Sequence, residues 1–203
     1  AFTGDGVDPA VMEGATQAIR AQQGCGVPTV KPWDRETLMQ KLDLALTADP
    51  MAIAMDIDAA GLPFLRNRMP PAGSKTVAEL REVAEHARKP FILKGIMTVR
   101  GAEKAVEAGA SAIVLPAIAD AVGDRVMVLV DGGIRTGLDV FKALALGADG
   151  VLIGRPFVTM VYGGGEEGVT AYVRKLTDEL SDTMAMCGAH SLKEINREML
   201  WQG

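Results

Sequence analysis

Charged side chains stand directly after several predicted strands of this 203-residue chain, where parallel α/β proteins place functional groups. Lys94 ends the apolar run Phe91-Ile-Leu-Lys, and an ammonium group at the end of a buried strand must find a partner. One interpretation is a fixed positive charge that stabilises a developing anion. The other is a structural ion pair with Asp56 or Asp131.

Glycine-rich loops follow two successive predicted strands in the segment 126–157. The first strand ends in Asp131-Gly-Gly-Ile-Arg135 and the second in Gly154-Arg155. Glycines let backbone N–H groups approach an anion, and a helix that starts after such a loop favours phosphate. Each arginine can donate paired N–H groups to phosphate oxygens. The pattern predicts a phosphate site; the alternative is a pair of tight turns with solvated arginines.

Short apolar runs alternate with longer amphipathic segments along the chain, which indicates right-handed βαβ units and a parallel sheet. No strand is followed by G-x-G-x-x-G, so the dinucleotide-binding form of a doubly wound sheet lacks its motif. We therefore favour an α/β fold of the (β/α)₈ TIM-barrel type, incomplete in this sequence, over an open doubly wound sheet. A stump of another strand is expected at 1–3, and the main strands are expected at 27–30, 51–57, 90–96, 111–115, 126–130 and 150–153.

Helices are expected between these strands. Thr76 and Glu79 form a capping-box pattern that opens one of them. Other apolar periods predict helices ending near Gly147 and running over 169–184. Ser191 and Glu194 are expected to cap a last helix whose inward face carries Leu192, Ile195 and Met199.

The composition is that of an ordinary globular domain, with 48% hydrophobic and 23% charged residues. A net charge of −5 argues against a nucleic-acid binder, which carries a basic excess. No apolar run reaches the roughly 20 residues that span a bilayer. Cys25 and Cys187 lie too far apart in sequence for a metal or redox motif. We expect a cytoplasmic protein without a metal, and a single barrel domain over residues 1–203.

The motifs of residues 90–109 and 126–157, PFILKGIMTVRGAEKAVEAG and VMVLVDGGIRTGLDVFKALALGADGVLIGRPF, carry a resemblance to a known family. The sequence resembles the FMN-dependent α-hydroxy-acid oxidases and dehydrogenases, which include lactate oxidase and glycolate oxidase. The likeness covers Pro28 to Met199 and includes the tail MAMCGAHSLKEI. It implies an FMN cofactor, a small 2-hydroxy acid as substrate, oxygen or another electron acceptor, and a homo-oligomer.

The resemblance also implies roles for individual residues. Lys94 corresponds to a catalytic cation at the N1/O2 edge of the flavin. Thr3 lies near a hydroxyl that touches the flavin. The residues implied to meet the ribityl chain and phosphate are Asp131, Gly132, Gly133, Arg135, Gly154 and Arg155.

Several positions depart from the family pattern. Lys31 and Trp33 stand where the family has Gln and Tyr, and Asp56 stands in place of a Thr. We expect Lys31 and Asp56 to contact the cofactor, and Trp33 to contact substrate. Arg66 is the nearest candidate for the arginine that binds the substrate carboxylate.

The largest departure is the missing base. The family's histidine lies in a Ser-Asn-His-Gly-Gly-Arg segment after the sixth strand, and no such segment occurs in this sequence. His86 and His190 are expected to be surface residues. The family's first strand and N-terminal lid are absent as well. We expect the complete polypeptide to exceed 21.4 kDa, with a segment carrying a His and an Arg between Val114 and Leu115 and with residues before Ala1.

The long segment 59–75 is interpreted either as a lid over the substrate or as a surface loop. The predicted function is oxidation of a lactate-like 2-hydroxy acid to the 2-oxo acid. One alternative is an FMN-dependent isopentenyl-diphosphate isomerase, and the other is a non-catalytic flavin-binding protein.

Overall fold

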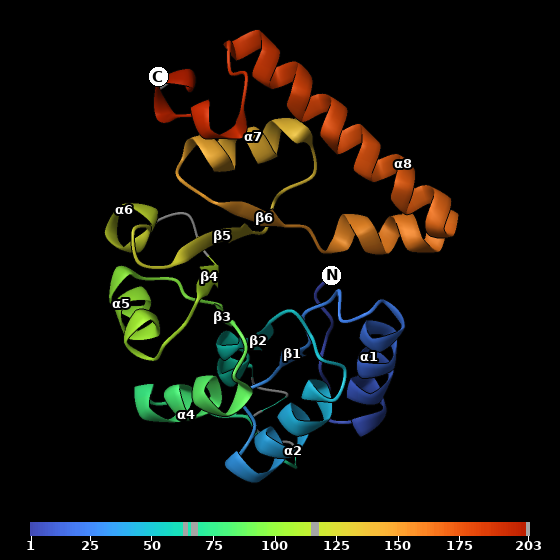
Figure 1. The fold of residues 1–203 in the computed structure, drawn as a ribbon, viewed down its shortest axis with the longest axis vertical. Helices are drawn as coiled ribbons and strands as arrows, with labels where there is room; N and C mark the ends of the chain where they lie inside the picture. The colour runs from blue at the N-terminus through green and yellow to red at the C-terminus, as the bar shows by residue number, and fades with distance from the viewer. Residues whose placement is uncertain (63–64, 66–68, 115–117, 202–203) are drawn as a thin grey trace. The chain divides into compact units, whose positions relative to one another are not determined.

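The computed structural model describes residues 1–62, 65, 69–114 and 118–201. Its internal contacts divide the chain into two compact units. Figure 1 shows the chain coloured by residue number from the N-terminus to the C-terminus. Unit 1 comprises Ala1–Val114 with Asp124–Val126, and unit 2 comprises Leu115–Gly123 with Met127–Gly203. Each unit is described by itself, and the single domain expected over residues 1–203 stays a prediction.

The described residues of unit 1 form four parallel strands that pair in chain order. They are β1 (Thr29–Val30), β2 (Ile53–Asp56), β3 (Phe91–Lys94) and β4 (Ala112–Val114). The expected stump at the N-terminus is present as a parallel bridge between Phe2 and Val27. A doubly wound sheet reverses its strand order at a switch point, whereas a barrel adds each strand beside the previous one. The order in this unit is that of a barrel.

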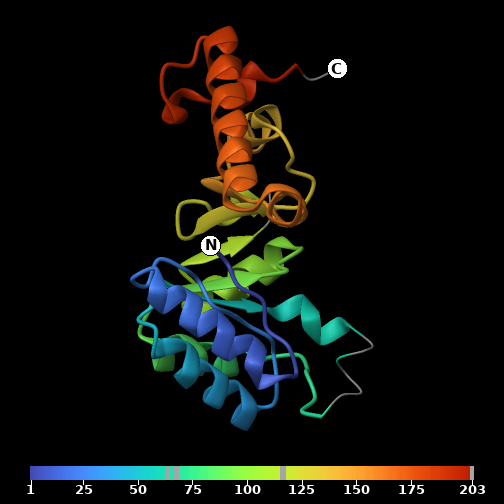
Figure 2. The same cartoon turned by 90° about the vertical axis from the view of Figure 1, so that its right-hand side faces the viewer.

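Four α-helices of unit 1 lie on the outer side of its strands (Figures 1 and 2). At the start of each one, a side-chain oxygen accepts a backbone N–H of the first turn, which satisfies a donor that lacks a helical partner. The capping box of Thr76 and Glu79 is present as predicted. The helices, with their capping residues, are α1 (Pro9–Ala21, Asp8), α2 (Arg35–Leu46, Asp34), α4 (Val77–Ala87, Thr76) and α5 (Val99–Glu107, Thr98); a 3₁₀ turn, η1 (Ile57–Gly61), follows β2.

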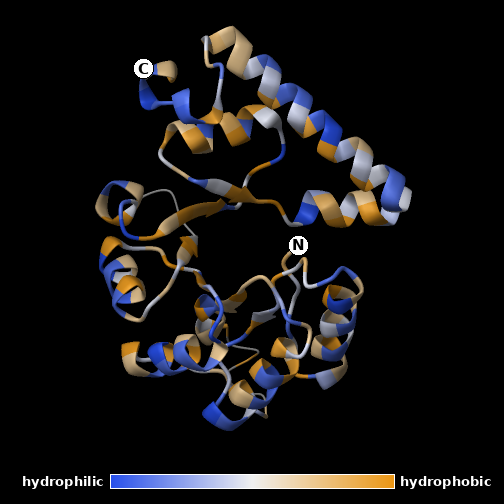
Figure 3. Cartoon of the chain, viewed as in Figure 1, coloured by the Kyte–Doolittle hydropathy of each residue, from blue (hydrophilic) through white to orange (hydrophobic). Residues whose placement is uncertain are grey.

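The core of unit 1 lies between its strands and helices. The strands are mostly apolar, while the helices carry polar residues along their length (Figure 3). The inner face of α5 is made of Ala102 and Ala105, both buried. Small side chains at these positions let the helix pack closely against its neighbours. Fully buried side chains of the strands include Val30, Ile53, Met55, Leu93 and Ile113.

The described residues of unit 2 form two parallel strands and three α-helices. Its elements are α6 (Ala119–Val122), β5 (Met127–Asp131), α7 (Gly137–Ala145), β6 (Gly150–Leu152) and α8 (Arg155–Cys187). Thr136 and Asp139 form a second capping box at the start of α7. The helix α8 is interrupted at Gly165, whose backbone is not helical. Phe141 and Ala145 of α7 pack in a buried cluster with Ala189 and Ile195.

The prediction of a last helix after Ser191 is wrong. The chain forms two 3₁₀ turns instead, η3 (Leu192–Glu194) and η4 (Arg197–Met199). The Glu194 carboxylate accepts hydrogen bonds from the Ser191 hydroxyl and the His190 N–H. These bonds stabilise a single 3₁₀ turn, and no α-helix follows it among the described residues. Ile195 follows in extended conformation and is buried, whereas Leu192 is 57% exposed rather than inward.

No helix in the described part of the chain is both long and apolar enough to cross a membrane.

Gly137 should be essential for the packing of α7 on α8. A Cβ at this position would lie 2.5 Å from the Leu176 carbonyl oxygen and still closer to the Leu180 nitrogen, so the two helices would have to separate. We expect Gly137→Ala to lower the free energy of unfolding by about 1–3 kcal/mol, the usual cost of overpacking.

Urea denaturation of the whole chain measures this change. Gly163→Ala is the matched control, because nothing lies within 4 Å of its Cβ position and it is inside α8. This control should be neutral or stabilising by up to about 1 kcal/mol. Equal midpoints for Gly137→Ala and the wild type would contradict the close approach.

Candidate functional site

Three charged side chains meet at the carboxyl ends of β1, β2 and β3. The Lys94 ammonium group donates to Asp56 Oδ1 at 2.8 Å, and Lys31 Nζ lies 3.8 Å from Asp56 Oδ2. The three side chains are each about one-fifth exposed, at 19–22%. We call these residues the charged row. The ion pair that the sequence offered as one explanation of Lys94 is therefore present, and its partner is Asp56.

The register of the parallel strands brings the row together. Asp56 pairs with Lys94, and Val30 pairs with Met55, so Lys31 follows β1 at the level of Asp56. Successive strand residues point to opposite faces, and these residues share one face. The same register, continued by one residue, sets the backbone of Val114 level with Lys94. The end of β4 thus lies level with the charged row.

A buried carboxylate fixes the backbone at Lys31. The Asp5 side chain is fully buried, and its Oδ2 accepts the Lys31 N–H at 3.0 Å. Its Oδ1 accepts the Lys41 ammonium group at 2.7 Å. Asp5 and Lys41 were not among the residues expected from the sequence. The signal that could have found Asp5 is an acidic residue between two glycines beside the N-terminal strand stump.

Trp33 is part of this buried cluster. Its Nε1 donates to Asp5 Oδ2 at 2.6 Å, and the Lys41 ammonium group lies 5.4 Å from the ring centroid. The side chain is fully buried, which makes it a core residue of unit 1. Its expected contact with substrate stays a prediction.

Thr3 carries a buried polar atom without a partner. Its backbone N–H donates to the Val27 carbonyl, but its Oγ1 is buried and makes no hydrogen bond; Thr29 Oγ1 is in the same condition. Buried hydroxyl groups are normally satisfied, so such an atom calls for an explanation. A bound group would supply the missing partner at Thr3.

Residues 69–75, the described end of segment 59–75, are hydrogen-bonded to the loop after β1. Ala72 bridges to Trp33, the Asp34 N–H donates to the Pro71 carbonyl, and the Gly73 N–H donates to the Pro32 carbonyl. This part is not a loose surface loop. Arg66, the expected carboxylate-binding residue, lies outside the described residues.

In unit 2, the loop after β5 exposes its backbone. Gly132 and Gly133 have φ of +92° and +80°, a region that side-chain-bearing residues rarely adopt. No atom lies within 4 Å of either Cβ position, so the backbone is open to a ligand. The loop ends at Arg135, whose N–H donates to Asp139 Oδ2 and whose carbonyl accepts the Tyr172 hydroxyl at 2.9 Å.

The hydrogen bond from the Thr136 hydroxyl holds the pKa of the Asp139 carboxyl below its usual value, and backbone N–H donors act in the same direction. Asp139 therefore stays ionised near neutral pH and keeps the capping box and the Arg135 backbone in place.

The loop after β6 ends at the start of α8. Gly154 is the N-cap residue, no side chain caps this helix end, and no atom lies within 4 Å of the Gly154 Cβ position. Arg135 and Arg155 are both exposed, and neither guanidinium has an ion pair within the described ranges. Pro156 has no N–H, and the N–H groups of Phe157 and Val158 donate to the Gly154 carbonyl. The open glycine backbone of the two loops and the two arginines without an ion pair still suit an anion such as phosphate.

Neither histidine lies at the end of a strand. His86 is on α4, where its Nε2 lies 2.6 Å from Asp43 Oδ1, and it is exposed. His190 is exposed beside η3. The expectation that both are surface residues is confirmed.

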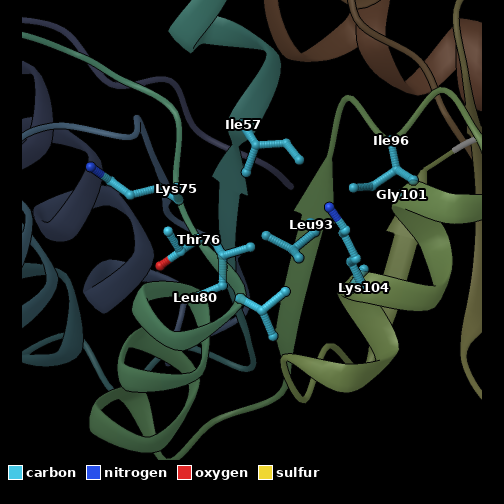
Figure 4. A pocket seen from close by; sticks show the side chains of 10 residues that line it. Ile57, Lys75, Thr76, Leu80, Leu93, Ile96, Gly101 and Lys104 are labelled. Carbon is cyan, nitrogen blue, oxygen red and sulfur yellow. The ribbon is translucent and has the colours of Figure 1, made fainter.

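A small apolar pocket of about 160 Å³ lies on the helix side of β2 and β3. Figure 4 shows Leu80, Leu93 and Ile96 in its wall, with Lys104 running along one side and Lys75 directed away. It contains no residue of the charged row. Within residues 1–62, 65, 69–114 and 118–201, no cluster of His, Cys, Asp or Glu could hold a metal ion.

Two kinds of comparison place this geometry among known proteins. A family model described as FMN-dependent dehydrogenase matches residues 34–115 and 111–202. The solved structure of mandelate oxidase with 3,3-difluoro-2-hydroxy-3-phenylpropionic acid superposes with a TM-score of 0.77 and 30% identity, over 90% of this chain and 65% of that one. The expected (β/α)₈ barrel, incomplete in this chain, is confirmed.

Curated relatives match over part of their length. They include an L-lactate dehydrogenase of Caulobacter vibrioides (38% identical over 141 residues, 61% of this chain) and an FMN-dependent alpha-hydroxy acid dehydrogenase of Schizosaccharomyces pombe (40% over 152 residues, 65% of this chain). Glycolate oxidase of Spinacia oleracea is 40% identical over 135 residues, 56% of this chain. The chain spans 37% of the length of each of these relatives.

The alignments contain a gap in this chain. The 141 positions matched to the Caulobacter protein take up 61% of 203 residues, which is about 124, so about 17 residues of the relative have no counterpart. The two blocks of the family match overlap at residues 111–115, which contain β4. Both facts fit a segment missing beside Val114.

Asp5→Asn should strongly destabilise unit 1. The substitution removes the charge that compensates the buried Lys41 ammonium group, and breaking a buried pair costs about 3–5 kcal/mol. Denaturant unfolding of the whole chain measures the loss. Asp43→Asn is the control, because its pair with His86 is exposed, and it should change stability little. A similarly small loss for both variants would show that Asp5 does not organise this unit.

Proposed function

Because the chain belongs to the FMN-dependent dehydrogenase family, we propose that it binds FMN and oxidises a small, lactate-like 2-hydroxy acid to the 2-oxo acid. The observation that carries this proposal is the cation at the end of β3, Lys94, held by Asp56. The names of the relatives, which include lactate dehydrogenase, glycolate oxidase and alpha-hydroxy acid dehydrogenase, support the class of substrate. FMN is the cofactor of this family.

Features of each unit fit FMN. In unit 1, the unpartnered Thr3 hydroxyl is ready for a polar group of the cofactor, and Lys94 supplies a positive charge. In unit 2, the open backbone at Gly132 and Gly133 leaves room for the ribityl phosphate. Arg155, at the first turn of α8, would hold the phosphate with its guanidinium group beside the open backbone at Gly154.

The reaction removes two hydrogens from the substrate. Bound FMN supplies the acceptor for the α-hydrogen with its electron pair. The hydroxyl proton must leave to a base, and general-base help is typically worth about 10²–10⁴ in rate. Lys94 would stabilise the negative charge that develops on the acceptor side, because a fixed cation needs no reorganisation during the reaction.

The base and the carboxylate clamp are assigned to a segment between Val114 and Leu115. The family resemblance implies a His and an Arg directly after this strand. The gap in the alignments and the meeting of the two family blocks at 111–115 support the position. Since Val114 is level with Lys94 in the register, side chains that follow it would join the charged row.

A second candidate is a non-catalytic flavin-binding protein. It is favoured by the placement of the two histidines, which lie on the surface away from the strand ends of their own units. In a polypeptide without the additional segment, the flavin would be held but no histidine would take the hydroxyl proton.

Mass spectrometry and flavin reduction distinguish the two candidates. Trypsin cleaves after Lys104 and Arg125, so a polypeptide without the additional segment produces the uninterrupted peptide Ala105–Arg125. The enzyme hypothesis expects this peptide to be absent, a mass above 21.4 kDa, and loss of visible flavin absorption on anaerobic addition of lactate, glycolate or mandelate. An intact Ala105–Arg125 peptide with unchanged absorption would establish the non-catalytic alternative.

Arg155→Ala should weaken FMN binding. A charge-assisted contact to phosphate is worth about 1.5–3 kcal/mol, which corresponds to a roughly ten- to hundred-fold higher Kd. Fluorescence titration of the apoprotein with FMN measures it. Arg174→Ala, which removes an exposed arginine of the same helix, should leave the Kd unchanged. Equal affinity in the Arg155 variant and the wild type would remove Gly154-Arg155 from the phosphate site.

A further inference from the structure

The charged row contains more positive than negative charge. Asp56 is shared: its Oδ1 accepts Lys94, and its Oδ2 faces Lys31 at 3.8 Å. Within the three residues of the row, two ammonium groups face one carboxylate, which sums to a net charge of +1. The Asp58 carboxylate, which lies against Gly95, is outside the row and is the same in every variant compared below. A pair of Lys94 and Asp56 alone would be neutral and would present only a dipole.

The backbone position of Lys31 is fixed by the fold. Its N–H is bound by the buried Asp5, and the following residues Pro32 and Trp33 are tied to Gly73 and Ala72. Lys31 is 19% exposed, so its charge is only partly screened by water. The fixed backbone keeps the Lys31 side chain within reach of Asp56 and of a group that binds beside Lys94.

We propose that Lys31 is an electrostatic residue of the flavin site that offsets Asp56 and thereby leaves the charge of Lys94 effective. This inference rests on the proposed function, since it requires FMN beside the row. Asp56 acts as a positioning residue: it accepts a hydrogen bond from Lys94 at 2.8 Å and would cancel its charge if Lys31 were absent. The site thus uses two lysines to present one net positive charge.

Charge counting predicts the order of the flavin midpoint potentials. Reduced flavin carries more negative charge, so the potential follows the net charge of the row. Lys31→Met and Lys94→Met both leave a net charge of zero and should shift the potential downward. Asp56→Asn leaves +2 and should shift it upward. The double variant Lys31→Met with Asp56→Asn returns the row to +1 and should lie near the wild type.

The test is a dye-coupled measurement of the midpoint potential of bound FMN, with the Kd for oxidised FMN measured in parallel. Lys31→Met should lower the ratio of affinities for reduced and oxidised flavin by at least ten-fold, about 30 mV for a two-electron couple. Lys31→Arg, which keeps the charge, should restore the wild-type potential. Lys75→Met is the matched control: it removes a lysine of the same unit at the rim of the apolar pocket and should have no effect.

A Lys31→Met protein that binds FMN with an unchanged potential overturns the inference. So does a variant that loses affinity for oxidised and reduced FMN equally, because that is the result of a structural role. Neither result touches the proposed function. A wild-type protein that fails to bind FMN would overturn the proposed function and this inference together.

Discussion

The buried carboxylate of Asp5 is the interaction on which unit 1 depends. It accepts the Lys41 ammonium group, the Trp33 indole, and the backbone N–H groups of Gly6 and Lys31. These partners come from the N-terminal segment, the end of β1 and helix α2, so one side chain joins three parts of the chain. A buried charge is tolerated only when it is paired and fully hydrogen-bonded, and here the four donors meet that requirement.

The charged row follows from this anchor and from the geometry of parallel strands. Adjacent parallel strands end at one edge, and their register decides which residues share a level. Asp56 and Lys94 are paired by register, while Lys31 lies beyond the last paired residue of β1 and depends on Asp5 for its backbone position. An identical set of residues shifted by one position in β1 would point Lys31 to the helix side. The strand register and the buried hydrogen bonds of Asp5 therefore determine both the packing of the core and the placement of the charges at the site.

Features with strong local signals could be predicted from the sequence. All six described strands were expected because each is an apolar run, and the capping box at the start of α4 was readable in the spacing of Thr76 and Glu79. The second box, Thr136 with Asp139, was not predicted. Helix α5 was not named individually among the expected helices, and its buried face carries Ala102 and Ala105. The box at Ser191 has the same spacing as a true helix start, but Ile195 turns extended to enter the core, and tertiary packing decided the outcome. Asp5 was missed because its partners lie 26 to 36 positions away in sequence.

The fold and the chemistry make different demands on the connection after β4. Three residues, 115–117, separate Val114 from Ile118 in the sequence, and connections of two to six residues are ordinary between strands and helices. Backbone continuity therefore does not require the family's longer segment. Oxidation of a hydroxy acid does require it, because proton transfer needs a base beside the substrate. Loss of such a segment would spare Asp5, the charged row and the glycine loops, and would remove only the proton acceptor and the clamp. A barrel of this family without the segment would therefore retain the residues proposed to bind flavin and would lose those proposed to act on the substrate.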